Sequence, residues 1–299
     1  MWSIRLRLPS STTGEVGSDE VGKRLPFVFS IFTFCLLLLV GLAIAAAPQN
    51  GHAPAAAYLG FDRNDYPGDD SLGSLRETFR FTGYWLNNPP GANSNSWRGK
   101  RSLLKSRGFG FLVLFNGRVY KQLKPSADAA ALGRADARSA VAAAKEEGFP
   151  VGTVIFIDQE EGGRMLPEQR AYLHAWVDVV SRAGYRAGVY CSGVPFKESS
   201  RETVVTAEDI RQHAGGREIV YWVANDACPP SPGCAVHAPA PGKSGVAFAS
   251  AWQFTQSPRR AKVAAGCADY NRDGNCYAPG TSIFVDFDAA DSPDPSHGR

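Results

Sequence analysis

The sequence lacks an excess of charge of either sign, because 32 lysines and arginines stand against 29 aspartates and glutamates in 299 residues. This balance excludes a strongly basic nucleic-acid binder. With 44% hydrophobic and 20% charged residues, the chain has too much apolar material for a disordered tail, and its composition does not fit a collagen-like fibre. We therefore expect a globular body that does not bind nucleic acid.

Three motifs that would assign a function directly are also missing. The segment GFDRNDYPG, which begins at Gly60 in the short β-rich run at residues 58–62, contains neither G-x-G-x-x-G nor a P-loop. A chitinase motif, D-x-x-D-x-D-x-E ending at Glu160, is absent because Thr153 and Phe156 occupy two of its acidic positions. The first two absences argue against an open, doubly wound nucleotide-binding sheet, which remains the alternative fold. The third argues against a chitinase-type barrel.

The one long apolar run covers residues 25–47, directly after a basic pair, and contains no charge. A basic start, an apolar core and small residues at 43–45 or 55–57 are typical of a cleaved secretory signal. The run is also close to the ~20 residues that span a bilayer, so an uncleaved anchor is the alternative. We expect residues 1–57 to be a signal peptide or anchor with a short linker. Residues 58–299 would be the exported domain, secreted or at the cell envelope, with no other membrane contact.

Cysteine usage also indicates an oxidising compartment. Five of the six cysteines lie outside the apolar run, and four of them form two close pairs in turn-rich segments, Cys228 with Cys234 and Cys267 with Cys276. We predict two loop-closing disulfides among these four residues, with the pairing left open. The fifth, Cys191, ends an apolar run and is expected to be a buried free thiol.

Two short patterns resemble metal sites without completing them. His237 follows Cys234 by three residues, but this spacing matches no common zinc finger. The run Asp269-x-Asn271-x-Asp273-Gly274 resembles the first half of a calcium loop, but its twelfth position is Gly280 instead of a bidentate glutamate. Zinc and calcium therefore remain minor alternatives, and we expect neither a metal nor any other cofactor.

Short β-rich apolar runs alternate with helical segments along the exported body. Helical patterns cover residues 71–80, 126–147, 167–183 and 206–214. Strand–helix–strand units predict a parallel sheet, and eight strands close into a (β/α)8 TIM-like barrel of the α/β class. The loops after the sixth and seventh strands lack clear helices, so we expect the barrel to be irregular there. The eight predicted strands are residues 58–62, 82–86, 109–115, 151–158, 185–190, 218–224, 250–254 and 282–288.

Three of these predicted strands end in carboxylates: Asp62 in the first, Asp158 and Glu160 in the fourth, and Asp286 and Asp288 in the eighth. In a TIM-like barrel the catalytic groups lie at the carboxyl ends of the strands. Cleavage of a glycosidic bond needs one carboxyl that stays protonated and one that is ionised. The pattern therefore favours a glycosidase, and the alternative is a set of solvated or arginine-paired acids.

Aromatic and amide side chains near strand ends extend this interpretation, because sugar rings stack on aromatic faces and amides bind hydroxyls. Trp252 and Gln253 are neighbours in one strand, so only one of them can face the cleft. The candidate substrate-binding residues are Tyr84, Trp85, Asn116, Tyr190, Tyr221, Trp222, Trp252, Gln253 and Asp288.

Four of these motifs together resemble a known family. GFD in the first strand, Asp158-x-Glu160, AWQF at 251–254 and FVDFD at 284–288 look like the glycoside-hydrolase-like domain family formerly described as domain of unknown function 1906. That family is similar to the glycoside hydrolase family 25 lysozymes. The resemblance covers residues from about Tyr58 to Ala290. It implies an eight-stranded barrel that cleaves between N-acetylmuramic acid and N-acetylglucosamine in peptidoglycan.

The resemblance also implies roles for particular residues. Glu160 matches the general acid and Asp158 its acidic partner, while Asp62 and Asp286 match the aspartates of the first and last strands. The pairs Tyr221-Trp222 and Trp252-Gln253 would line the sugar subsites.

The sequence departs from the lysozyme pattern at Arg63-Asn64-Asp65, where lysozymes more usually carry a small polar residue two positions after the aspartate, and in the cysteine-bearing loops. We expect a monomer that binds cell-wall glycan. A non-catalytic glycan-binding module on the same barrel is the alternative function.

Overall fold

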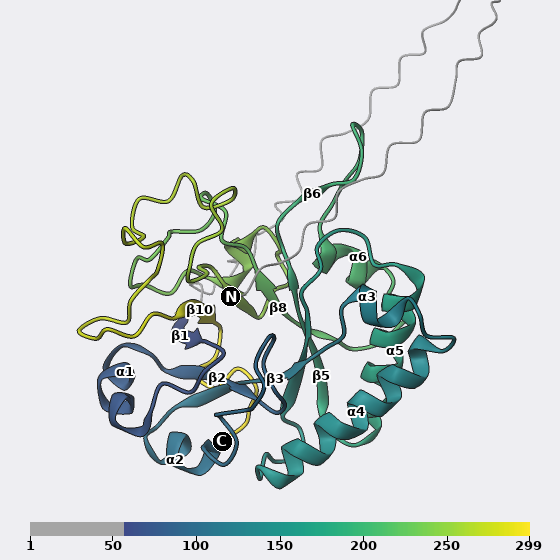
Figure 1. The fold of residues 1–299 in the computed structure, drawn as a ribbon, viewed down its shortest axis with the longest axis horizontal. Helices are drawn as coiled ribbons and strands as arrows, with labels where there is room; N and C mark the ends of the chain where they lie inside the picture. Colours follow the sequence, from purple (N-terminus) through teal and green to yellow (C-terminus); the bar gives the residue numbers. More distant parts are fainter. Residues whose placement is uncertain (1–56) are drawn as a thin grey trace, which may run out of the picture. The chain divides into compact units, whose positions relative to one another are not determined.

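The computed structural model describes residues 57–299 (Figure 1). The predicted leader, including its apolar run at residues 25–47, lies outside the described residues. Among residues 57–299 there is no helix with both the length and the apolar character needed to cross a bilayer.

The centre of the domain is a closed barrel of eight strands, and its order is β1-β2-β3-β4-β5-β8-β9-β10, with β10 next to β1. All eight strands predicted from the sequence are present, and the predicted α/β barrel is confirmed. A separate two-stranded hairpin, β6 (Phe196–Lys197) and β7 (Thr203–Val204), follows β5. The barrel strands are β1 (Tyr58–Asp62), β2 (Phe81–Trp85), β3 (Gly110–Asn116), β4 (Val154–Gln159), β5 (Arg186–Ser192), β8 (Val220–Ala224), β9 (Ala251–Gln253) and β10 (Asp286–Ala290).

The last strand runs against its neighbours, so the prediction of an entirely parallel barrel was wrong. The pairs from β1 through β9 are parallel, whereas β10 is antiparallel to both β1 and β9. The eighth strand was also misplaced, because Asp286 begins β10 instead of lying near its end. A parallel return needs a crossover, usually a helix. No helix lies between β9 and β10, so the chain re-enters the barrel from the end at which β9 left it.

Helices cover the outside of the barrel. The four predicted helices are present as α1 (Leu72–Thr78), α4 (Ala129–Glu146), α5 (Pro167–Arg182) and α6 (Thr206–Gln212), each shorter than predicted. Two short helices, α2 (Arg101–Ser106) and α3 (Tyr120–Leu123), and two 3-10 turns, η1 (Asp69–Ser71) and η2 (Pro241–Ser244), were not predicted from the sequence.

The two long helices pack side by side next to β3, β4 and β5 (Figure 1). The Asp128 carboxylate caps α4 by accepting a 2.8 Å hydrogen bond from the backbone N–H of Ala131. Gly133 lets α4 approach α5 closely, because a Cβ at this position would lie 2.2 Å from the carbonyl oxygen of Tyr172. In α5, Pro167 occupies the first turn, where its missing N–H costs nothing, and the predicted stripe containing Leu173 and Trp176 is buried.

The four paired cysteines form two disulfides, but each bond joins one loop to the other. Cys228 is bonded to Cys267 and Cys234 to Cys276, so the loop after β8 is linked twice to the loop after β9. Neither loop is closed on itself, which corrects the expectation of two loop-closing bonds. Cys191 is a buried free thiol, as predicted, and burial raises its pKa.

We predict that these cross-links stabilise the folded barrel. Replacing Cys228 and Cys267 together by serine should lower the free energy of unfolding by about 2–4 kcal/mol, because the unfolded chain regains the freedom of a long loop. Urea unfolding followed by tryptophan fluorescence measures this change. Cys191→Ala is the control, since it leaves both disulfides in place, and an unchanged urea midpoint in the double variant would contradict the prediction.

Candidate active site

Four buried aspartates meet where the parallel strands end. Asp62 is the last residue of β1, Asp158 lies near the end of β4, and Asp286 and Asp288 lie at the start of β10. Because β10 is antiparallel, its first residue stands opposite the last residue of β1, and Asp62 pairs in register with Asp286. Gly83 of β2 leaves room for Asp62, since a Cβ at Gly83 would lie 2.7 Å from the Asp62 Cβ.

One amide joins this cluster across the barrel. The Nε2 of Gln253 donates to Asp62 Oδ1 at 2.7 Å and to Asp286 Oδ2 at 3.4 Å. Its Oε1 accepts from the Tyr190 hydroxyl at 2.7 Å and from Gln256 Nε2 at 3.2 Å. Gln253 therefore fixes carboxylates of β1 and β10 relative to a tyrosine of β5.

A tryptophan supports the fourth aspartate. Trp222 Nε1 donates to Asp288 Oδ1 at 3.0 Å, and the rings of Trp222 and Tyr190 lie 4.7 Å apart. The second carboxylate oxygens of two of these aspartates, Asp62 Oδ2 and Asp288 Oδ2, are buried without a hydrogen-bond partner in residues 57–299. Asp286 Oδ1 accepts a 2.5 Å hydrogen bond from the backbone N–H of Ser257.

Burial and mutual repulsion make these acids hold protons more tightly than usual. Burial raises the pKa of Asp62 to about 6, although the hydrogen bond from Gln253 opposes this change. The pKa of Asp158 is raised well above its ordinary value, first by burial and then by the charges of Glu160 and Asp62. Burial and the charge of Asp62 raise the pKa values of Asp286 and Asp288 as well. Carboxyls in this state can keep a proton near neutral pH.

Asp158 differs from the other three because both of its carboxylate oxygens are buried without a hydrogen-bond partner in residues 57–299. A buried carboxyl without partners is costly, so such groups tend to mark functional sites. Glu160 follows β4 by one residue and is half-buried, and its charge acts on Asp158. The predicted pair Asp158-x-Glu160 is thus brought to the same end of the barrel as Asp62 and Asp286.

Several predicted substrate-binding residues lie on the inner side of the strands. Tyr190, Trp222 and Gln253 belong to the hydrogen-bond network of the aspartates. Trp85 occupies the same side of β2 as Gly83, and its Nε1 donates to the backbone carbonyl of Arg63 at 3.2 Å. Between Trp252 and Gln253, the choice left open by the sequence, it is Gln253 that faces the interior.

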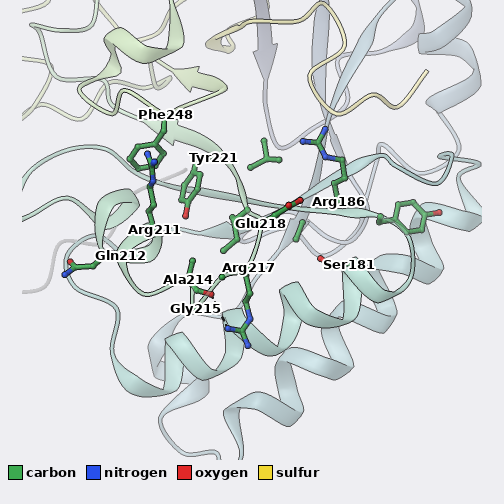
Figure 2. Close-up of a pocket in the computed structure, with 15 residues that line it drawn as sticks. Ser181, Arg186, Arg211, Gln212, Ala214, Gly215, Arg217, Glu218, Tyr221 and Phe248 are labelled. Carbon is green, nitrogen blue, oxygen red and sulfur yellow. Dashed lines mark hydrogen bonds between the residues drawn. The ribbon is translucent and has the colours of Figure 1, made fainter.

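Three other predicted aromatic residues lie on the outer side of their strands. Tyr84 donates to Glu147 Oε2 at 2.5 Å, and Trp252 Nε1 donates to the backbone carbonyl of Asn225 at 2.8 Å. Tyr221 packs against Phe248 in a separate pocket (Figure 2). Neighbouring residues in a strand point to opposite faces, so these three are not brought to the aspartates.

Asn116, at the end of β3, has a local structural partner. Its Nδ2 donates to the backbone carbonyl of Asn88 at 2.9 Å, and its backbone N–H donates to Asn87 Oδ1 at 2.7 Å. It also lines a surface pocket of about 450 Å³ with Asn87 and Arg98. The structure therefore gives Asn116 a turn-forming role at the rim of the barrel.

Sequence reasoning missed Gln256 and Ser257, which contact Gln253 and Asp286 from the loop after β9. Their position just after AWQF was the one sign in the sequence that they could lie near the site. Loop residues have no periodicity from which the direction of a side chain can be predicted. Ser257 also lines a pocket of about 260 Å³ beside Asp286, together with Arg63 and Phe284. The Arg63 guanidinium stands 5.4 Å from the centre of the Phe284 ring. Arg63, where the sequence departs from the lysozyme pattern, thus lies beside Asp286.

Within residues 57–299, no group of three or more histidine, cysteine, aspartate or glutamate side chains is arranged to hold a metal ion. The Asp273 carboxylate, part of the calcium-like pattern, accepts hydrogen bonds from Asn275 and from the Tyr277 hydroxyl. It is therefore used inside its own turn.

A closed barrel with several acids at one end is the arrangement that glycoside hydrolases of this fold use. Residues 87–232 match the family described as Rv2525c-like, glycoside hydrolase-like domain. The family resemblance predicted from the sequence is confirmed. The matched segment contains Asp158 and Glu160, while Asp62 and Asp286 lie outside it.

The chain is also similar to solved structures at low identity. An uncharacterized B. stearothermophilus protein is 22% identical, with 78% of this chain and 95% of that chain covered and a TM-score of 0.50. The Mycobacterium tuberculosis Tat-secreted protein Rv2525c is 15% identical, with 82% and 98% covered and a TM-score of 0.48. A bacterial lysozyme from Streptomyces coelicolor is 15% identical, with 79% and 92% covered and a TM-score of 0.46. No curated protein matches the chain.

The raised pKa of Asp62 predicts that stability falls as the pH rises. Its value of about 6 in the folded protein exceeds the ordinary 3.8, so the folded state binds the proton more tightly between these values. The free energy of unfolding should then drop by about 3 kcal/mol from this group between about pH 4 and pH 7. Urea unfolding at a series of pH values measures the slope.

Asp62→Asn should reduce this pH dependence, because the amide does not titrate, and should leave the part due to the other three aspartates. Asp70→Asn, at an exposed position before α1, is the matched control for the loss of a carboxylate. Equal slopes for the parent protein and Asp62→Asn would show that Asp62 does not carry the effect.

Proposed function

We propose that the protein is an exported glycosidase that cleaves the glycan of cell-wall peptidoglycan in the manner of an N-acetylmuramidase. The observation that carries this proposal is the convergence of Asp62, Asp158 and Asp286 with Glu160 at one end of the barrel. The glycoside hydrolase-like family of residues 87–232 supports it. The two disulfides suit a location outside the cytoplasm, where such a substrate is found.

In the proposed mechanism Glu160 is the general acid. It donates a proton to the glycosidic oxygen as the bond from the anomeric carbon breaks, and positive charge develops on the ring. Water then adds to the anomeric carbon and gives its proton to a carboxylate of the site, which completes the hydrolysis. Asp158 lies two residues earlier in the chain, and the charge of Glu160 acts on it. Two acids this close do not both ionise readily, so one proton is kept within the pair.

Asp62, with a pKa of about 6, is largely ionised at neutral pH and would stabilise the positive charge that develops on the reacting sugar, with Asp286 paired beside it. They are held in place by Gln253, which donates to both carboxylates. A charge fixed in advance by such hydrogen bonds needs no rearrangement during the reaction, which is the main source of electrostatic stabilisation in enzymes.

Tyr190 and Trp222 are fully buried, and each donates to a residue of the cluster, Gln253 and Asp288 respectively. We assign them a positioning role beneath the substrate. Trp85 is equally buried and would act in the same way, so the pocket formed by Arg63 and Phe284 is the candidate contact for a neighbouring sugar ring.

Glu160→Gln tests the proposal directly. The glutamine cannot donate the proton, so release of reducing ends from purified peptidoglycan should fall by about 10²- to 10⁴-fold. Binding to the same peptidoglycan, measured by pull-down, should persist. Glu146→Gln, on the exposed end of α4, makes the same chemical change away from the barrel mouth and should retain full activity.

Equal release by the parent protein and Glu160→Gln would remove Glu160 from the mechanism. If the parent releases nothing while both proteins bind equally, the barrel is a non-catalytic glycan-binding module and the enzymatic proposal fails.

A further inference from the structure

A larger pocket lies at the other end of the barrel strands. It has a volume of about 920 Å³ and is bounded by the C-terminal ends of α5 and α6 and by the first residues of β5 and β8 (Figure 2). Arg186 begins β5 and lines this pocket, whereas Tyr190 of the aspartate network lies four residues further along the same strand. Four residues of strand span roughly 13 Å, so the two sites are separate.

An arginine without an ionic partner is held at one side of this pocket. The Arg211 guanidinium lies 4.2 Å from the centre of the Phe248 ring, and Figure 2 shows its side chain running beside Tyr221 to that ring. Arg211 forms no ion pair or side-chain hydrogen bond within residues 57–299. Stacking on an aromatic face fixes the plane of a guanidinium but leaves its N–H groups free along the edge.

The other charged residues of the pocket do not neutralise Arg211. Arg217 is already paired with Asp178, through bonds of 2.7 Å and 3.0 Å to its two carboxylate oxygens. Arg186 has no ion pair in the described part of the chain, and Glu218 is the one acid among the lining residues. The pocket therefore has an excess of positive charge, and this charge is unpaired at Arg211.

The Tyr221 hydroxyl supplies a second free donor. Tyr221 is only 6% exposed, it lines the pocket, and its hydroxyl has no hydrogen-bond partner in residues 57–299. Its ring meets that of Phe248 edge to face, with centroids 4.8 Å apart. The ring of Tyr221 is packed while its hydroxyl opens onto the pocket, so it can donate to a ligand there.

We propose that this pocket binds an anionic saccharide, whose carboxylate or phosphate oxygens accept hydrogen bonds from Arg211 and Tyr221. A single small ion would fill little of the volume of about 920 Å³, which lies within the range of about 300–1,000 Å³ found for small-molecule sites. The anionic part of the proposal rests on the pocket alone. The saccharide part rests on the proposed function.

The test is calorimetric titration of the full-length protein carrying Glu160→Gln, so that the probes stay intact. The anionic probe is a tetrasaccharide of alternating glucuronic acid and N-acetylglucosamine, and the neutral probe is the tetramer of N-acetylglucosamine. Adding Arg211→Met should weaken binding of the anionic probe by about tenfold, because a charge-assisted hydrogen bond is lost. Binding of the neutral probe should stay unchanged. Tyr221→Phe should weaken anionic binding by about fivefold.

Arg138→Met, on the exposed face of α4, removes the same charge far from this pocket and is the matched control. The proposal is overturned if Arg211→Met binds the anionic probe as tightly as its parent, or if Arg138→Met weakens it equally. Circular dichroism of each variant verifies its fold. Since no cleavage is measured, failure of the enzymatic proposal would leave this result intact.

Competition identifies the source of the anion. Displacement of the anionic probe by inorganic phosphate at lower concentration than by acetate assigns the site to a phosphate-bearing saccharide, and the reverse order assigns it to a carboxylate-bearing one. If neither ion displaces the probe, an anion is not what the pocket recognises and the proposal is wrong.

Discussion

The direction of β10 is the constraint on which the candidate site depends. As an antiparallel strand between β1 and β9, it presents its first residues at the end where the other strands finish. Asp286 therefore stands opposite Asp62, and Asp288 stands opposite Gln253. If β10 ran parallel to its neighbours, its first residues would lie at the far end of the barrel and Asp286 could not join the cluster. The chemistry proposed here thus follows from an irregularity in the barrel.

Concentrating buried acids in this way is unfavourable, and the surrounding structure compensates for it. Each of the four aspartates has a raised pKa, which means that the fold disfavours its charged form. Gln253 and Trp222 offset part of the cost through hydrogen bonds. The loop carrying Gln256 and Ser257 is tied to the loop after β8 by two disulfides. An irregular segment without helices is thereby held firmly against the cluster.

The sequence predicted the strands and long helices well because their signals are local. Apolar runs bounded by turn residues marked all eight strands, and the stripe around Trp176 marked α5. The acids at strand ends were also visible. Three features were not local and were missed: the direction of β10, the pairing of Cys228 with Cys267, and the contact of Ser257 with Asp286. Each depends on where a long turn-rich loop returns in space, and neither composition nor periodicity records that.

Because side chains alternate along a strand, one strand contributes residues to the interior of the barrel and to its outer surface. In β8, Trp222 points inward and supports Asp288, while its neighbour Tyr221 points outward beside Phe248. The pair Tyr221-Trp222 was predicted to line one sugar cleft. In the structure only Trp222 lies at the aspartates, and Tyr221 lies in the separate outer pocket. Because the strand between them is rigid and buried, ligands at the two sites would act independently unless one saccharide chain is long enough to reach both.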